Sequence, residues 1–163
     1  MSYLKVEMDL DELINFNKRL TNPRLFQAYC REALLEAAND FLKTIKSRTP
    51  KTGEPNPVTG RVWNWKQNHP AGQLREAWTK DNQNLKAKVV TKANGFEITL
   101  VNNTEYASWV EKGHRKFIFG RDTGEWTMGT FFLKRTEVEF ENGRLAKSVE
   151  KKLTDWIKEV VYG

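Results

Sequence analysis

Residues 23–48, which read PRLFQAYCREALLEAANDFLKTIKSR, form the longest amphipathic pattern in the sequence. Apolar side chains recur along this stretch at spacings of three and four, which is the periodicity of one helix face. Asn22 followed by Pro23 is typical of a helix start, with a capping side chain before a proline at the first helical position. Thr49-Pro50 is typical of a helix end. The stretch therefore predicts one long helix over residues 23–48.

The flanking segments predict strands and a second helix. Residues 3–8 alternate between apolar and polar side chains, as in a half-buried strand, and apolar residues recur at helical spacing over residues 145–160. Asn94-Gly95 is typical of a two-residue hairpin turn, and a turn centred there pairs Thr91 with Ile98. The apolar faces of these elements supply the expected core residues: Leu34, Phe41, Val89, Ile98, Leu100, Trp109 and Trp156.

Shorter elements are expected in the remaining segments. These are a short helix capped by Asp9 or Asp11, a helical turn over residues 73–78, a strand over residues 85–91, a helix from Thr104 to Gly113, a strand over residues 117–120, and a turn at Asp122-Thr123-Gly124 that leads residues 125–128 back beside that strand. The pattern of residues 136–141 fits a helix and a strand equally well. We find no composition shift or repeat that divides residues 1–163 into two domains.

Composition excludes several classes of protein. The chain has 163 residues, of which 39% are hydrophobic and 12% aromatic, too many for a disordered chain. Its apolar runs are too short for a membrane span, and the N-terminus does not resemble a signal peptide. A single cysteine, Cys30, excludes an intramolecular disulfide and favours folding in a reducing cytoplasm.

The net charge of +6 is uneven, because basic residues outnumber acidic ones by 7 to 3 within residues 54–92. Such an excess fits a nucleic-acid partner, although a solvated cationic surface is favoured.

The residue types that carry chemistry do not form a recognisable site. His69, His114 and Cys30 lie far apart in the sequence and lack the paired spacing of a zinc site. No nucleophile elbow or phosphate-binding loop occurs. Glu111 and His114 have a spacing that could pair an acid with a base, but Gly113 is expected to end the helix between them. The sequence therefore predicts no enzyme, no metal and no cofactor.

Residues 54–71 predict a long loop, because prolines and glycines interrupt any regular structure. The loop contains two tryptophans beside basic residues, and its candidate contact residues are Arg61, Val62, Trp63, Trp65 and Lys66. Three interpretations remain open: a protein interface, which is favoured, packing onto its own domain, and stacking on single-stranded nucleic acid. We expect this loop to be mobile in the free subunit and to become ordered on assembly.

The order of motifs along the chain is distinctive. The long helix runs into Thr49-Pro50-Lys51-Thr52-Gly53, and Gly72-Gln73-Leu74-Arg75-Glu76-Ala77-Trp78 and the hairpin follow. Next comes the run YASWVEKGH at residues 106–114, and GTFFL at residues 129–133 leads into the C-terminal helix. Over roughly residues 23–160 this order resembles the gene-product-ten family of tail components from long-tailed bacteriophages and prophages, which is similar in role to minor tail protein Z of lambda-like phages. In that family the Thr-Gly and Leu-Arg pieces usually lie closer together than they do here.

The resemblance implies an α+β fold, in which a small antiparallel sheet carries the long N-terminal helix and a C-terminal helix follows. It also implies a virion protein without catalysis, which acts in tail completion or head–tail joining at the neck, is assembled in the host cytoplasm, and contacts other tail and neck proteins within a homo-oligomeric ring. The family motif residues that could contact another subunit are Thr49, Pro50, Gly53, Leu74, Arg75, Tyr106, Ala107, Val110, Glu111, Gly113 and His114. A nucleic-acid-binding accessory protein that uses the Trp-containing loop is the alternative.

The run at residues 106–114 also has a physical interpretation of its own. Tyr106, Trp109 and Val110 are expected to anchor a short helix, while Glu111 and His114 project from its end as polar groups. A role in maintaining the fold and a role in contacting a partner are equally open for it.

Overall fold

The computed structural model describes residues 2–9, 23–56, 60, 62 and 70–162. These residues belong to two compact units. Unit 1 comprises Met1–Tyr3, Leu42–Asn82 and Val101–Glu137, and unit 2 comprises Leu4–Phe41, Gln83–Leu100 and Val138–Gly163. A single domain over residues 1–163 stays a prediction. The short helix expected after Asp9 lies outside the described residues.

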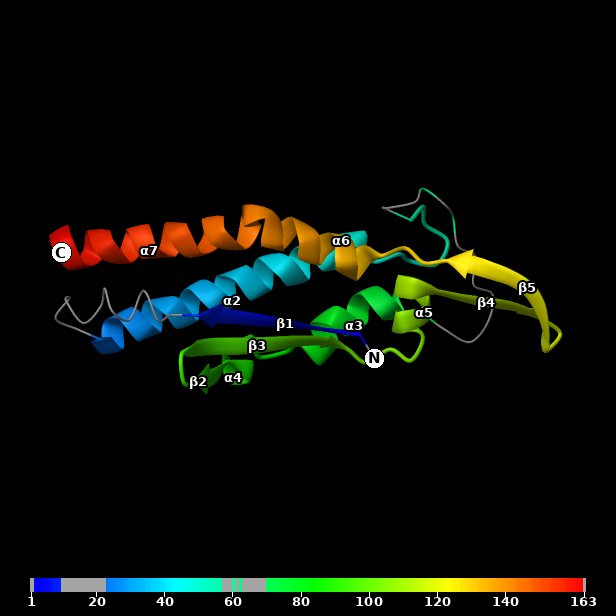
Figure 1. The fold of residues 1–163 in the computed structure, drawn as a ribbon, viewed down its shortest axis with the longest axis horizontal. Helices are drawn as coiled ribbons and strands as arrows, with labels where there is room; N and C mark the ends of the chain where they lie inside the picture. The colour runs from blue at the N-terminus through cyan, green and yellow to red at the C-terminus, as the bar shows by residue number, and fades with distance from the viewer. Residues whose placement is uncertain (1, 10–22, 57–59, 61, 63–69, 163) are drawn as a thin grey trace. The chain divides into compact units, whose positions relative to one another are not determined.

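Unit 2 contains a small sheet and a pair of helices (Figure 1). The sheet order is β1 (Ser2–Asp9), β3 (Gly95–Asn102), β2 (Val90–Lys92). Helix α2 spans Pro23–Arg48, as predicted, and helix α7 spans Leu145–Tyr162. Buried aromatic rings join the two helices, since the ring centroids of Phe26 and Trp156 lie 4.9 Å apart. The α+β fold class is confirmed.

The β2–β3 hairpin corrects one sequence prediction. Thr91 pairs with Phe96 rather than with Ile98, so the two turn residues are Ala93 and Asn94. The segment expected to begin a strand at residue 85 instead forms helix α4 (Leu85–Lys88). Leu85 and Val89 are both buried, and their spacing of four residues suits a helical turn better than an alternating strand.

Unit 1 contains helix α3 (Gln73–Asp81), helix α5 (Ala107–Lys112) and an antiparallel hairpin of β4 (Gly113–Ile118) and β5 (Arg121–Met128). Ile118 pairs with Arg121, which places the hairpin turn at Phe119-Gly120 rather than at residues 122–124. The Asp-Thr-Gly piece forms an irregularity within β5 instead, because Arg115 pairs with Trp126 whereas Phe117 pairs with Asp122. Its turn-forming residues therefore bend a strand rather than connect two.

The ambiguous residues 136–141 are helical. Helix α6 (Phe132–Glu139) continues into a five-residue π-helical segment, η1 (Phe140–Arg144), and then into α7. The expected break at Asn142-Gly143 is a kink, where Gly143 adopts φ 116°. Glycine supplies that positive φ without the steric cost that a side chain would bring.

The predicted core is buried with one exception. Leu34, Phe41, Val89, Ile98, Leu100 and Trp156 are all buried, and Phe41 packs edge-to-face on Phe140 at 5.0 Å between ring centroids. Trp109 is exposed, so its assignment to the core was wrong. Tyr106 and Val110 supply the buried side of α5, and the indole of Trp109 lies on another side of this short helix.

Candidate assembly surface

The C-terminal end of α2 is held by the first two family motifs. Thr49 is fully buried, and its carbonyl oxygen accepts hydrogen bonds from Nε and Nη2 of Arg75 at 3.1 and 3.0 Å. Its hydroxyl donates to the carbonyl of Ile45 and accepts from Nε1 of Trp78 at 3.1 Å. Helix carbonyls at a C-terminus lack partners within the helix, so Arg75 and Trp78 fix the point at which the chain leaves α2. Pro50, which follows, is also buried.

An ion-pair network extends this arrangement to the loop that follows. Glu54 accepts from Lys51 at 2.7 Å and from Nη1 of Arg75 at 3.2 Å. These contacts, with the hydrogen bond from Lys51 first among them, hold the pKa of the Glu54 carboxyl below its usual value. Gly53 lies between the two partners with φ 81° and is exposed. Arg75 therefore joins Thr49 and Glu54 through one guanidinium group.

The next two motifs meet through α3. Nδ2 of Asn102, which is fully buried, donates to the carbonyl of Leu74 at 2.8 Å. Tyr106, four residues after Asn102, is buried and donates a hydrogen bond through its hydroxyl to Gln73 at 3.4 Å. The Leu-Arg piece and the Tyr-Ala piece thus contact each other inside unit 1.

Glu111 does not project into solvent, contrary to expectation, but is buried with 5% of its surface exposed. Its two carboxylate oxygens accept backbone N–H groups of Leu133 and Lys134, each at 2.9 Å. Those groups belong to the first turn of α6, where N–H groups lack intrahelical acceptors, so Glu111 caps that helix from 22 residues away in sequence. Burial raises the pKa of Glu111, and the two backbone hydrogen bonds oppose that rise.

Gly113 ends α5, as expected, with φ 89° and ψ 175°. A Cβ atom at this position would lie 2.3 Å from the backbone oxygen of Thr127 and 2.7 Å from the nitrogen of Gly129. A Cβ at Gly129 would lie 2.2 Å from the carbonyl oxygen of Glu111. The two glycines therefore allow the end of α5 and the end of β5 to approach at backbone contact.

These observations define a motif cluster within unit 1. Its members are Thr49, Leu74, Arg75, Tyr106, Ala107, Val110, Glu111 and Gly113. Seven of them, including Gly113, are buried, and Arg75 is half-buried. His114, the last motif residue, is half-buried with its ring 6.1 Å from that of Trp109. A subunit-contact role for these residues stays a prediction, and their contacts in this chain are with one another.

The β4–β5 hairpin leaves this cluster at Gly113 and carries charged residues in pairs. Arg115 bonds Asp122 at 2.5 Å, and Lys116 bonds Glu125 at 2.7 Å. The pKa of Asp122 is lowered by the backbone N–H of Gly124 and by Arg115, and Lys116 lowers the pKa of Glu125. The ionic charges of the hairpin are thus largely satisfied within it.

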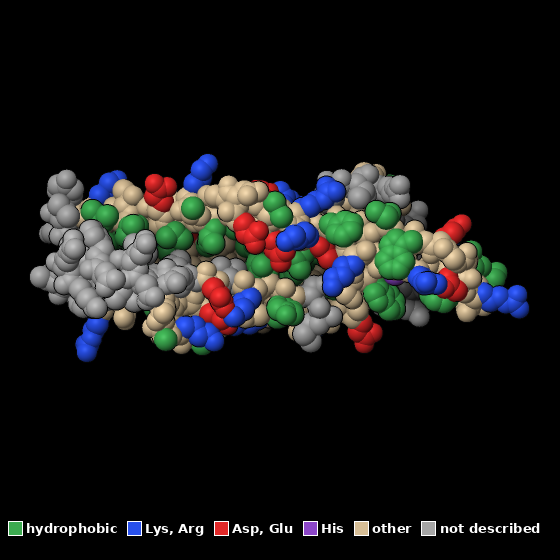
Figure 2. Space-filling model, in the orientation of Figure 1, with side chains coloured by type: hydrophobic (Ala, Val, Ile, Leu, Met, Phe, Trp, Pro, Cys, Tyr) green, Lys and Arg blue, Asp and Glu red, His purple; other side chains and the backbone are tan. Residues whose placement is uncertain are grey.

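The same hairpin exposes large apolar side chains. Figure 2 shows hydrophobic side chains gathered over the part of the molecule that carries α5, β4 and β5. We call this group the hairpin surface and define it by its exposed members: Trp109, Phe117, Ile118, Phe119, Trp126 and Met128. Trp126 and Met128 share one face of the hairpin because they pair with Arg115 and Gly113. Exposed apolar groups of this size are typical of interaction sites.

Sequence reasoning missed the hairpin surface. The available signal was the run Phe117-Ile118-Phe119, which contains three consecutive apolar residues. A strand with such a run needs a layer that covers it. The contact loop favoured from the sequence lies mostly outside the part of the chain that the structure describes. Arg61, Trp63, Trp65 and Lys66 lie outside the described residues, and Val62 is exposed and forms an isolated bridge with Pro55.

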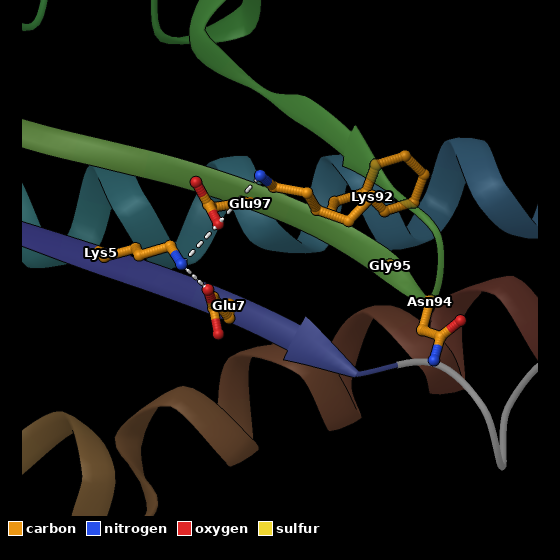
Figure 3. Close-up of a pocket in the computed structure, with 7 residues that line it drawn as sticks. Lys5, Glu7, Lys92, Asn94, Gly95 and Glu97 are labelled. Atoms are coloured by element: carbon orange, nitrogen blue, oxygen red, sulfur yellow. Dashed lines mark ion pairs between the residues drawn. The ribbon is translucent and has the colours of Figure 1, made fainter.

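A second polar feature lies beside the β2–β3 turn in unit 2. A pocket of about 300 Å³ is lined by residues of β1, β2 and β3 and by the turn (Figure 3). Lys5 bridges Glu7 and Glu97, and Lys92 lies 3.7 Å from Glu97. The hydrogen bond from Lys5 is the main reason that the pKa of Glu97 is lowered, and the two glutamates raise the pKa of Lys5 to about 12. Positive and negative side chains are equal in number here, so the pocket has no charge preference for a ligand.

The described residues offer little else with chemical function. Cys30 is buried on α2, and burial raises the pKa of its thiol to about 11, as expected for an inert cysteine. Across residues 2–9, 23–56 and 70–162, no three His, Cys, Asp or Glu side chains come together as metal ligands. Among the helices described, none has both the length and the apolar character needed to cross a membrane.

Comparison with known proteins decides what the chain is related to. The model of the family described as "Bacteriophage HK97-gp10, putative tail-component" matches residues 11–113, which is more than half of the chain. The chain belongs to this family. The resemblance predicted from the motif order is confirmed, although the family match ends at Gly113, where β4 begins, and does not include residues 129–133. No curated protein and no solved structure matches the chain.

Proposed function

We propose that this chain is a structural component of a phage or prophage neck, where it completes the tail and takes part in joining the tail to the head. In this proposal it has no catalytic activity and needs no cofactor. It contacts other tail and neck proteins, stands in a closed ring of copies of itself, and reaches the virion after synthesis in the host cytoplasm. Membership of the tail-component family is the observation that carries the proposal.

Two structural features support a role in assembly rather than in chemistry. The motif residues are used in holding unit 1 together, through the clamp of Arg75 on Thr49 and the cap of Glu111 on α6. The hairpin surface, by contrast, presents aromatic side chains to the outside of the same unit. A rigid body that carries an exposed aromatic surface suits a subunit that is covered by its neighbours.

The proposal is tested by complementation in vitro. A phage or induced prophage that lacks this gene should produce filled heads and separate tails, and the purified full-length chain should restore infectious particles when it is added to that lysate. Electron microscopy of the two samples identifies the step that fails. Heads and tails that join normally without the chain would contradict the proposal.

A DNA-retention experiment on the same protein tests the nucleic-acid alternative. Saturable binding that falls steeply with salt would favour an accessory protein for nucleic acid, because phosphate contacts release counterions. We expect binding that is absent or insensitive to salt. The purified chain from the complementation experiment is sufficient for both measurements.

A further inference from the structure

We propose that the hairpin surface is covered by a second copy of this chain. The inference rests on the proposed role as a ring subunit and names the surface through which the copies meet. Four features of the β4–β5 hairpin lead to it: the strained turn, the exposed aromatic area, the size of the sheet and the pairing of its charges.

The turn places a bulky residue where it is least favourable. Phe119 and Gly120 have φ of 49° and 77°, the positive values that a two-residue hairpin turn requires and that Asn or Gly normally supplies. A phenylalanine at such a φ is strained, and the side chain of Phe119 is 100% exposed. Among the residues that the structure describes, none covers the ring to compensate either cost. The side chain becomes favourable only when another molecule covers it.

The exposed aromatic area is close to what a specific interface needs. Trp109, Phe117 and Trp126 are 57%, 60% and 57% exposed, and Phe119 is wholly exposed. Because an aromatic side chain has about 150–250 Å² of surface, these four present about 400–700 Å². A standard interface buries about 800 Å² on each partner. Met128, which shares a face with Trp126, adds to the area, so the surface can supply a large part of one side.

The β4–β5 sheet is small, which makes a covering layer favourable. Within the described part of the chain, β4 and β5 pair only with each other. A two-stranded hairpin is marginally stable in water, and a third strand or a packed layer is normally required. Large apolar side chains of the hairpin are exposed and can contact such a layer. A neighbouring molecule that packs on the hairpin would supply it.

The charges favour a second copy over DNA, lipid or an acidic protein. An anionic partner is attracted by unpaired basic side chains. Here two of the three basic residues of the hairpin, Arg115 and Lys116, are paired with Asp122 and Glu125. Copies of a chain with net charge +6 repel each other over most of their surface, so they can meet most easily where the charge is locally balanced. With three basic and two acidic side chains, the hairpin comes close to such a balance.

The test measures self-association of the full chain and of a variant that keeps its fold. Phe119→Asn gives the turn an Asn-Gly pair, which suits its positive φ values, and removes the exposed ring. Tyr3→Ser is the matched control, because Tyr3 is also an exposed aromatic residue but lies on β1. Sedimentation velocity at protein concentrations of about 1–100 µM detects association at the weak affinities that an interface of this size can have.

We expect concentration-dependent association of the natural chain, at least a tenfold weaker association constant for Phe119→Asn with an unchanged or higher melting temperature, and no change for Tyr3→Ser. Benzoylphenylalanine placed at position 119 should crosslink to a product of twice the mass of the chain. A natural chain that stays monomeric throughout this range, or a Phe119→Asn variant that associates normally, would overturn the inference.

Crosslinking in assembled particles separates this inference from the proposed function. A crosslink from position 119 to another tail protein would overturn self-association through the hairpin and leave the neck role intact. Failure of the natural chain in the complementation experiment would overturn the neck role instead.

Discussion

The motif cluster and the hairpin surface lie next to each other in unit 1 and meet at Gly113, yet they differ in almost every physical respect. The motif cluster is buried, and its polar groups bond backbone atoms of elements that are far apart in sequence. The hairpin surface is exposed and apolar, and all its members except Trp109 of α5 lie on two paired strands or in the turn between them. The motif residues thus hold unit 1 together, whereas every member of the hairpin surface except Trp109 lies beyond the family match.

The difference teaches that a family motif and an interface need not coincide. Motif residues such as Thr49 and Glu111 are costly to replace because each accepts hydrogen bonds from buried donors: the indole N–H of Trp78 for Thr49, and two backbone N–H groups of α6 for Glu111. Residues such as Phe117 can be replaced with little effect on the folded subunit. Variants in the motif cluster should therefore lower the free energy of unfolding, whereas variants on the hairpin surface should mainly reduce assembly.

The largest effect is expected where the two regions join. Gly113→Ala forces a Cβ to within 2.3 Å of a backbone oxygen at a positive φ, and we expect a loss of about 3–5 kcal/mol or failure to fold. Gly124→Ala is the control, because Gly124 also has a positive φ of 74° but has open space around it. We expect that variant to lose only about 1–2 kcal/mol. Urea unfolding measures both, and equal losses would show that steric contact at Gly113 is unimportant.

A smaller effect is expected within the motif cluster. Arg75→Met removes two hydrogen bonds to the buried carbonyl of Thr49, and we expect the free energy of unfolding to fall by about 2–3 kcal/mol. Arg135→Met is the control, since Arg135 is exposed on α6. A loss below that of the control would mean that the α2 end is held without the clamp.

On the hairpin surface the expected effect on stability is close to zero. Phe117→Ser should change the free energy of unfolding by no more than about 0.5 kcal/mol, because the ring is mostly exposed. The variant should nevertheless reduce the yield of infectious particles in the complementation assay. A strongly destabilised variant would show that Phe117 packs within the subunit, and the contrast with the motif cluster would fail.

The two regions are also expected to respond to acid in opposite directions. The pKa of Glu111 is raised in the folded state, so its contribution to stability increases as the pH falls from that value toward the unfolded value of about 4.3. The pKa of Asp122 is lowered in the folded state, so its contribution to stability is present above about pH 3.9, the unfolded pKa. That contribution is lost as the pH falls through the pKa of the folded state.

Thermal unfolding of Glu111→Gln and Asp122→Asn between about pH 3 and pH 6 checks both signs. As the pH falls, the melting temperature of Glu111→Gln should decrease relative to that of the natural chain, and the melting temperature of Asp122→Asn should increase relative to it. Parallel curves for the two variants would contradict the assignment of opposite shifts.

Much of the fold could be predicted because it rests on local chemistry. Pro23 and Thr49-Pro50 bound α2 at the predicted residues, and Gly113 ends α5. Local signals failed where two of them competed. Asn94-Gly95 indicated a turn centred one residue too late, and Asp122-Thr123-Gly124 indicated a turn where the strand only bends, because Phe119-Gly120 makes the connection.

The candidate site was harder to predict because its contacts span long distances in sequence. Glu111 caps a helix 22 residues later, and nothing in the spacing of Glu111 and His114 indicates that partner. Trp109 was assigned to the core by residue type, yet α5 is only six residues long and can bury few of its sides. An exposed tryptophan is an exception to the usual distribution, and exceptions of this kind are visible only in the structure.

The Arg75 clamp has a consequence for how far the length of the segment between Glu54 and Arg75 can change. Thr49 and Glu54 on one side and Arg75 on the other are tied directly, so the intervening loop is closed by contacts that do not depend on its content. Lengthening such a loop costs little, about 0.6 kcal/mol for each doubling of its length. The segment between Glu54 and Arg75 is therefore a place where residues can be inserted or removed at low thermodynamic cost while the end of α2 keeps its contacts.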